Sequence, residues 1–263
     1  MNDIFDESRD IFNLNSRTSR ISCIHSISEE IDFNIFGDAI SSIEAELNSR
    51  IEMVKSESAK LNDEILDYSQ NVVKIPSQED LLISDKLNDY YSDQQMYMQY
   101  LTVLLEMKIV YMFKTLEINM KALIKTAYPH VITRGFYKWE DMVLFFKSIY
   151  INVSGIVGYQ EVIELKKVNN CIKHKESIND EVKKIREFSS LDYFDSDSIT
   201  AFSERIKEII KKFFKGLSDQ VIKDLFDFDQ SRIDKICEDY SNRMDKKTFE
   251  KFIESLNKKL QCK

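Results

Sequence analysis

The amino-acid sequence predicts an all-α protein in which long helices are joined by short polar connections. Of its 263 residues, 43% are hydrophobic and 11% are aromatic, which is enough to build a sizeable buried core. Only five glycines and two prolines are present, whereas architectures rich in β-turns use more of both. Apolar residues also recur at three- and four-residue steps over long segments, as amphipathic helices require.

The N-terminal segment, residues 1–28, is rich in Ser, Asn and Arg and lacks a sustained apolar period. We therefore expect a loosely ordered arm, with local docking of Ile21, Ile24 and Ile27 left open. Its first ten residues, MNDIFDESRD, lack the basic region and the continuous apolar core of a secretory signal. No segment approaches the roughly 18 uninterrupted apolar residues of a membrane span, so we expect a cytoplasmic protein without membrane contact.

The next region, residues 29–89, is expected to be dominated by one long amphipathic helix from Phe36 to Gln70. Its apolar stripe consists of Ile40, Ile43, Leu47, Ile51, Val54, Leu61, Ile65 and Leu66. The helix should end before Pro76, because the residue before a proline disfavours helix. The stripe breaks between Lys55 and Lys60, which favours packing on its own domain but leaves an intermolecular coiled coil open.

Residues 90–217 are expected to form a helical bundle. A core helix over residues 90–128 is apolar on more than one side, and its methionines are interpreted as core filler rather than as a metal box. A second amphipathic helix is predicted over residues 139–149, and a short turn then leads to a helix that ends at His174. Ile199–Leu217, with Gly216 near its end, is predicted to be the last core helix.

Two connecting regions complete the prediction. Ser77, three residues before Asp80, is a candidate start for a further short helix ahead of the core helix. The polar segment from Glu181 to Ser198 is expected to be a loop. The last region, residues 218–263, carries alternating charges and is expected to be a short helical extension of the bundle.

Net charge and cysteine spacing exclude several classes of site. A formal net charge of -8 argues against a surface that binds nucleic acid over its whole extent, although a local basic patch remains open. The four cysteines, Cys23, Cys171, Cys237 and Cys262, show neither CxxC nor Cys/His ligand spacing. We therefore expect reduced thiols and neither a metal site nor a cofactor.

The segment ELKKVNNCIKHKES, residues 164–177, has the strongest chemical pattern in the chain. On a helix, Lys167, Asn170 and His174 form one polar stripe, because seven residues nearly complete two turns. The opposite side is apolar and should face the core, with Val162, Leu165, Val168 and Ile172. A histidine there can move protons near neutral pH. A simple solvent-facing stripe is the alternative interpretation.

The order of LEINMKAL in the core helix, FYKWED at the second helix and then ELKKVNNCIKH resembles the HEPN superfamily (higher eukaryotes and prokaryotes nucleotide-binding domain). Its members are helical bundles, and many are ribonuclease toxins or anti-phage effectors. The resemblance covers residues 90–217. The family signature has an arginine four to six residues before a histidine, often with Asn directly after the arginine. When His174 is placed at the histidine position, Asn169 falls at the position of the arginine and Asn170 at the position after it. NNxxxH therefore replaces RNxxxH in this chain.

The resemblance implies a metal-independent endoribonuclease whose site lies at a homodimer interface. Such a protein would act on RNA as a toxin or anti-phage defence effector, together with an antitoxin or another defence-system protein. The residues assigned to this site are His174, Asn170, Asn169 and Lys167 for catalysis, Lys166, Lys173 and Lys175 for RNA binding, and Glu117 as a supporting acid. Lys166, Lys167 or Lys173 would have to replace the arginine, and of these Lys167 has the right face. A lysine lacks the planar fork that binds phosphate at two points.

Two other interpretations remain open. The first is a catalytically degenerate HEPN-fold module that binds a partner protein, a nucleotide or RNA without cleavage. The second is direct nucleic-acid binding by the lysine run that continues through Lys183 and Lys184. Glu117 also has an ordinary alternative, because its spacing from Lys121 is that of a routine ion pair within a helix.

Overall fold

The computed structural model describes residues 17–33, 37–69, 78–131, 135–174 and 177–261. Every regular element in these ranges is helical, which confirms the all-α prediction. The α-helices are α1 (Arg17–Glu29), α2 (Gly37–Ser69), α3 (Gln78–Ala127), α4 (Trp139–Ser148), α5 (Tyr159–His174), α6 (Ser196–Phe226), α7 (Gln230–Arg243) and α8 (Lys246–Gln261), with short 3₁₀ turns η3 (Val153–Gly155) and η4 (Arg186–Phe188). None of these helices is long and apolar enough to cross a membrane.

The chain divides into two compact units, residues 1–219 and 220–263. The sequence placed a boundary after residue 217, because Gly216 was interpreted as the end of the last core helix. The two units divide close to that position, but the helix does not end there, since α6 continues through Gly216 to Phe226. A Cβ atom at residue 216 would lie 3.0 Å from Cγ2 of Ile156, so this glycine permits a close approach rather than ending the helix.

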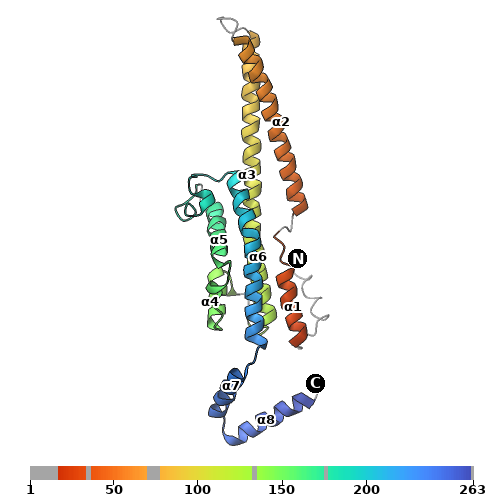
Figure 1. Ribbon diagram of the computed structural model, residues 1–263, viewed down its shortest axis with the longest axis vertical. Helices are drawn as coiled ribbons and strands as arrows, with labels where there is room; N and C mark the ends of the chain where they lie inside the picture. Colours follow the sequence, from red (N-terminus) through yellow and green to blue (C-terminus); the bar gives the residue numbers. More distant parts are fainter. Residues whose placement is uncertain (1–16, 34–36, 70–77, 132–134, 175–176, 262–263) are drawn as a thin grey trace. The chain divides into compact units, whose positions relative to one another are not determined.

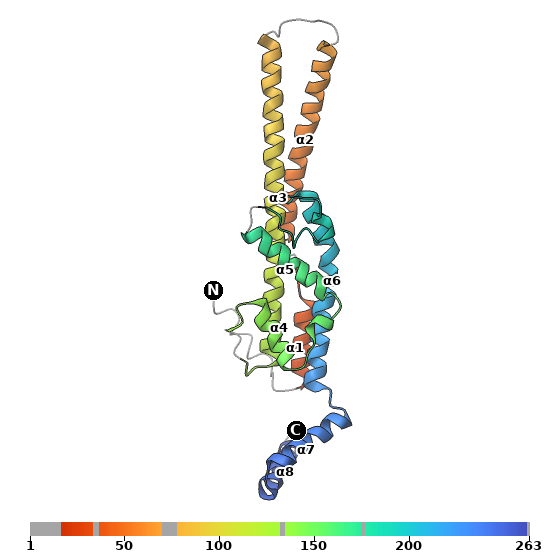
Figure 2. The ribbon, with the colours of Figure 1, turned by 90° about the vertical axis from the view of Figure 1, so that its left-hand side faces the viewer.

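In the first unit, α3 is the central element and α2 runs beside it (Figures 1 and 2). The predicted long helix is confirmed as α2, whose Ile51 and Val54 are buried, so α2 packs on its own domain. The short helix expected near Asp80 is not separate, because α3 runs without interruption from Gln78. Pro76 and Ser77 lie outside the described residues.

The core of the first unit lies along the C-terminal half of α3, where α1, α4, α5 and α6 surround it (Figure 2). Its fully buried large side chains include Leu105, Ile109, Met112, Leu116, Met120, Phe146, Phe202, Phe213 and Phe214. Within the expected N-terminal arm, residues 17–28 belong to α1. That helix packs on α3 and buries Ile24 completely, while residues 1–16 lie outside the described part of the chain.

The connection between α5 and α6 is irregular, as predicted, but it is packed rather than loose. It buries Ile178, Val182, Ile185 and Phe188. The ring of Phe188 lies 5.2 Å from that of Phe202 in α6. The connection therefore contributes to the core and holds the C-terminal part of α5 near α6.

The second unit contains the end of α6 together with α7 and α8. Each of the last two helices begins at an aspartate cap. Asp229 accepts a hydrogen bond from the backbone N–H of Arg232 (2.7 Å), and Asp245 accepts one from that of Thr248 (2.8 Å). The rings of Tyr240 and Phe252 are stacked 5.5 Å apart, which joins α7 to α8.

Candidate functional site

The candidate site lies on α5, whose first turn is fixed by a glycine. Gly158 has a φ of 93°, in the left-handed region that favours glycine. A Cβ atom there would lie 2.7 Å from the carbonyl oxygen of Ile209 and 2.9 Å from Cβ of Phe213, both in α6. The absence of a side chain lets α5 begin directly against α6.

The two sides of α5 have the predicted polarity. Val162, Leu165 and Val168 have no exposed surface, whereas Ile172 is only half-buried. On the polar stripe, Asn170 and His174 are exposed, and the side chain of Lys167 is 33% exposed. His174 is the last residue of α5, so its ring is open to solvent at the end of the helix.

Asn169, at the position of the family arginine, lies on the buried side of α5. It is 1% exposed, and its amide nitrogen donates to the side-chain oxygen of Asn170 (3.1 Å). Its own side-chain oxygen has no hydrogen-bond partner in the described part of the chain. A neutral buried amide cannot supply the cation that phosphoryl chemistry needs, and it does not lie with the exposed stripe.

The lysines of α5 are matched by carboxylates. Nζ of Lys167 lies 2.9 Å from Oε2 of Glu181, and Lys166 forms an ion pair with Glu140 of α4. Hydrogen bonds from Lys184 and Lys167 lower the pKa of Glu181 to about 2, so this carboxylate stays charged. RNA would have to displace these acids to reach Lys166 and Lys167.

Glu117 of α3 belongs to a second polar group, which we call the mixed-charge cluster: Glu117, Lys121, Lys166 and Lys173. Burial raises the pKa of Glu117, and the charges of Lys121, Lys173 and Lys166 oppose that rise. Burial lowers the pKa of Lys166, with Glu117 opposing. Lys166, Asn169 and Lys173 share one side of α5 by their spacing, and this side adjoins the polar stripe. Glu117 therefore lies near the lysines of α5, while its interaction with Lys121 is also the ordinary ion pair that the sequence left open. Lys175 lies outside the described residues.

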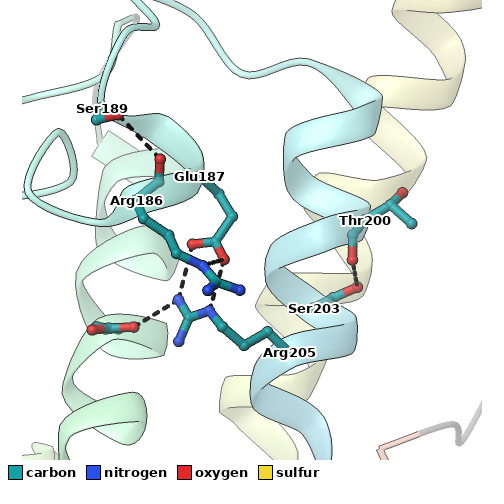
Figure 3. Close-up of polar contacts among 7 residues, drawn as sticks. Arg186, Glu187, Ser189, Thr200, Ser203 and Arg205 are labelled. Carbon is teal, nitrogen blue, oxygen red and sulfur yellow. Dashed lines mark hydrogen bonds and ion pairs between the residues drawn. The ribbon is translucent and has the colours of Figure 1, made fainter.

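An arginine that the sequence analysis missed ties α5 to the rest of the first unit. Arg205 of α6 donates from Nε and Nη2 to the two carboxylate oxygens of Glu187 (2.7 and 2.9 Å) and from Nη2 to Glu164 of α5 (2.9 Å) (Figure 3). Arg186 adds a bond to Glu187 (2.7 Å). Figure 3 shows these side chains converging between the connection and α6. We call this group the Arg205 clamp.

The electrostatics of the clamp follow from its burial. The Glu187 side chain is only 6% exposed. Burial alone would raise its pKa, but hydrogen bonds from Arg205 and Arg186 outweigh that effect and lower the pKa to about 2. The sequence signal for the clamp was a single arginine between Phe202 and Ile206, two fully buried residues of α6.

The described residues contain no group of three or more His, Cys, Asp or Glu side chains arranged to hold a metal ion. Comparison with protein-family models, with curated proteins and with solved structures gave no match. The exposed stripe on α5 thus offers a solvent-accessible histidine and amide, while the neighbouring Lys166 and Lys167 are already paired with acids.

Proposed function

We propose that this chain is a non-enzymatic interaction module of HEPN-like architecture, which binds a helical segment of a partner protein along α3. The observation that carries the proposal is a row of exposed apolar side chains, which we call the α3 ridge: Tyr100, Val103, Met107 and Ile118. Their exposed fractions are 54%, 53%, 49% and 53%. Single exposed apolar residues are common, but four that share one side of a helix are typical of a docking surface.

The spacing of the ridge fits a helical partner. At about 100° per residue, the four positions fall within roughly 60° of one another and span roughly 27 Å of helix. Leu82, which is 64% exposed, has the same phase five turns earlier. An amphipathic helix with apolar residues at steps of three and four would pack along such a row.

The charges at the N-terminal end of the ridge indicate the kind of partner, whereas the exposed Lys114 lies in line with the ridge between Met107 and Ile118. Asp89 and Asp93 are exposed and continue the line of the ridge towards the N-terminus of α3. Glu106 lies beside it, half-buried, and burial raises its pKa. A partner helix that carries lysine or arginine at one end of its apolar stripe would complement these carboxylates.

The test compares two surfaces of the same helix. The Val103→Asp/Met107→Asp double variant places charge on the ridge, and Met98→Asp places it on the other side of α3, where Met98 is 44% exposed. Tagged chains are purified from the native host at matched levels, and bound proteins are quantified by mass spectrometry. We expect one partner with a basic amphipathic helix to be lost with the ridge variant and kept with Met98→Asp. A partner set that is identical for both variants would contradict the proposal, provided that circular dichroism shows both to be folded.

A second candidate function is the metal-independent endoribonuclease. It is favoured by the exposure of Asn170 and His174 at one end of α5, where RNA has access to both. In that role His174 would transfer the proton of the attacking 2′-hydroxyl, and a nearby cation would stabilise the phosphorane. Two copies would have to bring their stripes together.

This candidate is tested by induced expression of the wild type, His174→Ala and the control His130→Ala. His130 is exposed in the connection after α3 and is remote in sequence from the stripe. Ribonuclease activity predicts growth arrest and RNA fragments for the wild type and His130→Ala but not for His174→Ala. Intact RNA in all three strains would exclude the ribonuclease and leave the interaction module as the proposed function.

A further inference from the structure

The second unit has an apolar face that no described residue of that unit covers. We call it the hairpin face: Ile233, Ile236 and Tyr240 of α7, with Ile253, Leu256 and Leu260 of α8. Their exposed fractions run from 38% for Ile236 to 68% for Leu260. No described side chain of α7 or α8 is buried. The pair of helices therefore has an apolar side but no core of its own.

The apolar residues of the hairpin face follow a regular helical spacing. In α8, Phe249, Ile253, Leu256 and Leu260 follow one another at steps of four, three and four residues, the period of helices that pack in coiled-coil fashion. Lys247, Lys251 and Lys258 lie on the opposite side of that helix by the same spacing. The Tyr240–Phe252 stack joins the faces of the two helices.

We infer that this face is an interface between two copies of the chain, in which the α7–α8 hairpins pair as a four-helix bundle. Helices of 14 and 16 residues are marginal alone and need packing to be stable. A second hairpin supplies an equivalent apolar layer, and bundles of four helices built from two hairpins are an established architecture.

Area and charge both suit a second copy. The exposed parts of the six side chains of the face add up to roughly 400–700 Å² per copy if a large side chain presents about 150–250 Å². Together with the aliphatic parts of the flanking side chains, this area approaches the ~800 Å² per partner of a standard interface. Residues 220–263 carry ten Lys and Arg against nine Asp and Glu, so each copy of this unit has a net charge of only +1 and two copies repel each other little, whereas the whole chain has a charge of -8.

This interface is separate from the α3 ridge and from the α5 stripe, so it extends the proposed function rather than restating it. A dimer joined through its second units would carry two α3 ridges. Binding to a partner with repeated helices would then gain from bivalency without any new contact on the ridge.

The inference is tested with the full chain by sedimentation velocity across a concentration series. Ile253→Glu/Leu256→Glu places two charges on the hairpin face. Ser255→Glu/Asn257→Glu adds the same charge at exposed positions outside it. We expect a dimer for the wild type and for the control, and a dissociation constant raised at least ~100-fold for the face variant, because two carboxylates would be desolvated in the interface.

Several results would overturn the inference. They are a wild type that is monomeric at every concentration, a dimer that the face variant leaves intact, and a monomer whose hairpin instead binds vesicles of acidic lipid. The Val103→Asp/Met107→Asp variant separates this inference from the proposed function. It should keep the dimer while losing the partner, and loss of the dimer in that variant alone would place self-association on the α3 ridge instead.

Discussion

Replacing Arg205 with methionine should destabilise the first unit more than any change to its surface ion pairs. Methionine keeps the length of the side chain but removes the three hydrogen bonds to Glu187 and Glu164. The side chain of Glu187, which is only 6% exposed, then keeps Arg186 as its one charged partner from the clamp. The side chain of Arg186 is itself 76% exposed. The variant leaves a nearly buried carboxylate without its main partner.

The expected loss of unfolding free energy can be calculated in two ways. Removing one member of a buried ion pair typically costs 3–5 kcal/mol, and the remaining Arg186 contact puts the expected loss near the lower end, about 3 kcal/mol. The fall in the pKa of Glu187 from 4.5 to about 2 corresponds to a similar figure, on the order of 3 kcal/mol. For a unit of this size, such a loss lowers the melting temperature by roughly 6–12 °C.

The pH dependence gives an independent check. The pKa of Glu187 is lower in the folded protein than in the unfolded chain, so the clamp contributes fully above about pH 4.5 and loses its contribution as the pH falls towards 2. The difference in unfolding free energy between the wild type and Arg205→Met should therefore be largest near neutral pH and should shrink in acid.

Urea unfolding followed by circular dichroism, at a series of pH values, measures both quantities. Lys211→Met is the control, because Lys211 pairs with Glu208 across one turn of the same helix at the surface, where such pairs contribute about 0.3–0.5 kcal/mol. The reasoning is refuted if Arg205→Met loses less than about 1 kcal/mol, or if its difference from the wild type is the same at pH 3 and pH 7.

Two further changes test the placement of α5. Gly158→Ala should lower the free energy of unfolding by more than about 2 kcal/mol, because its Cβ would lie 2.7 Å from a backbone oxygen at a φ of 93°. The control Gly135→Ala, with no atom within 4 Å of its Cβ, should change it by no more than about 0.5 kcal/mol. Equal unfolding midpoints for the two variants would contradict this. Asn169→Leu should be neutral within about 1 kcal/mol, because its buried side-chain oxygen has no partner among the described residues, while Val168→Ala should lose stability through a cavity. A loss above about 2 kcal/mol for Asn169→Leu in thermal unfolding would mean that the amide is an essential contact.

How far the sequence predicts this molecule depends on whether a feature is periodic or arises from contacts across the chain. The apolar period located α2, α4 and the buried side of α5, because each needs only the spacing of its own residues. Gly216 was misinterpreted because a glycine can end a helix or admit a neighbour, and only the position of Ile156 decides between them. The missed Arg205 clamp joins residues 18 and 41 positions apart, which no local pattern records.

The same limit explains why the motif on α5 was harder to interpret than the helix that carries it. The spacing placed Lys167, Asn170 and His174 on one side correctly, but it gave no sign that Asn169 is buried or that Lys167 is paired with Glu181. The burial depends on how α5 packs in the first unit, and the pairing depends on Glu181 in the connection after α5.

Function is therefore easier to test on α3 than on α5. The core-facing residues of α3, such as Leu105 and Leu116, are almost completely buried, while the ridge on its other side is about half exposed. Substitutions on the ridge can remove a binding surface without disturbing the core beneath it. Most side chains of α5 take part either in the core, in the mixed-charge cluster or in the Arg205 clamp, so changes there alter stability and chemistry together. His174 is exposed at the end of the helix, so its substitution tests the ribonuclease candidate without removing a buried contact.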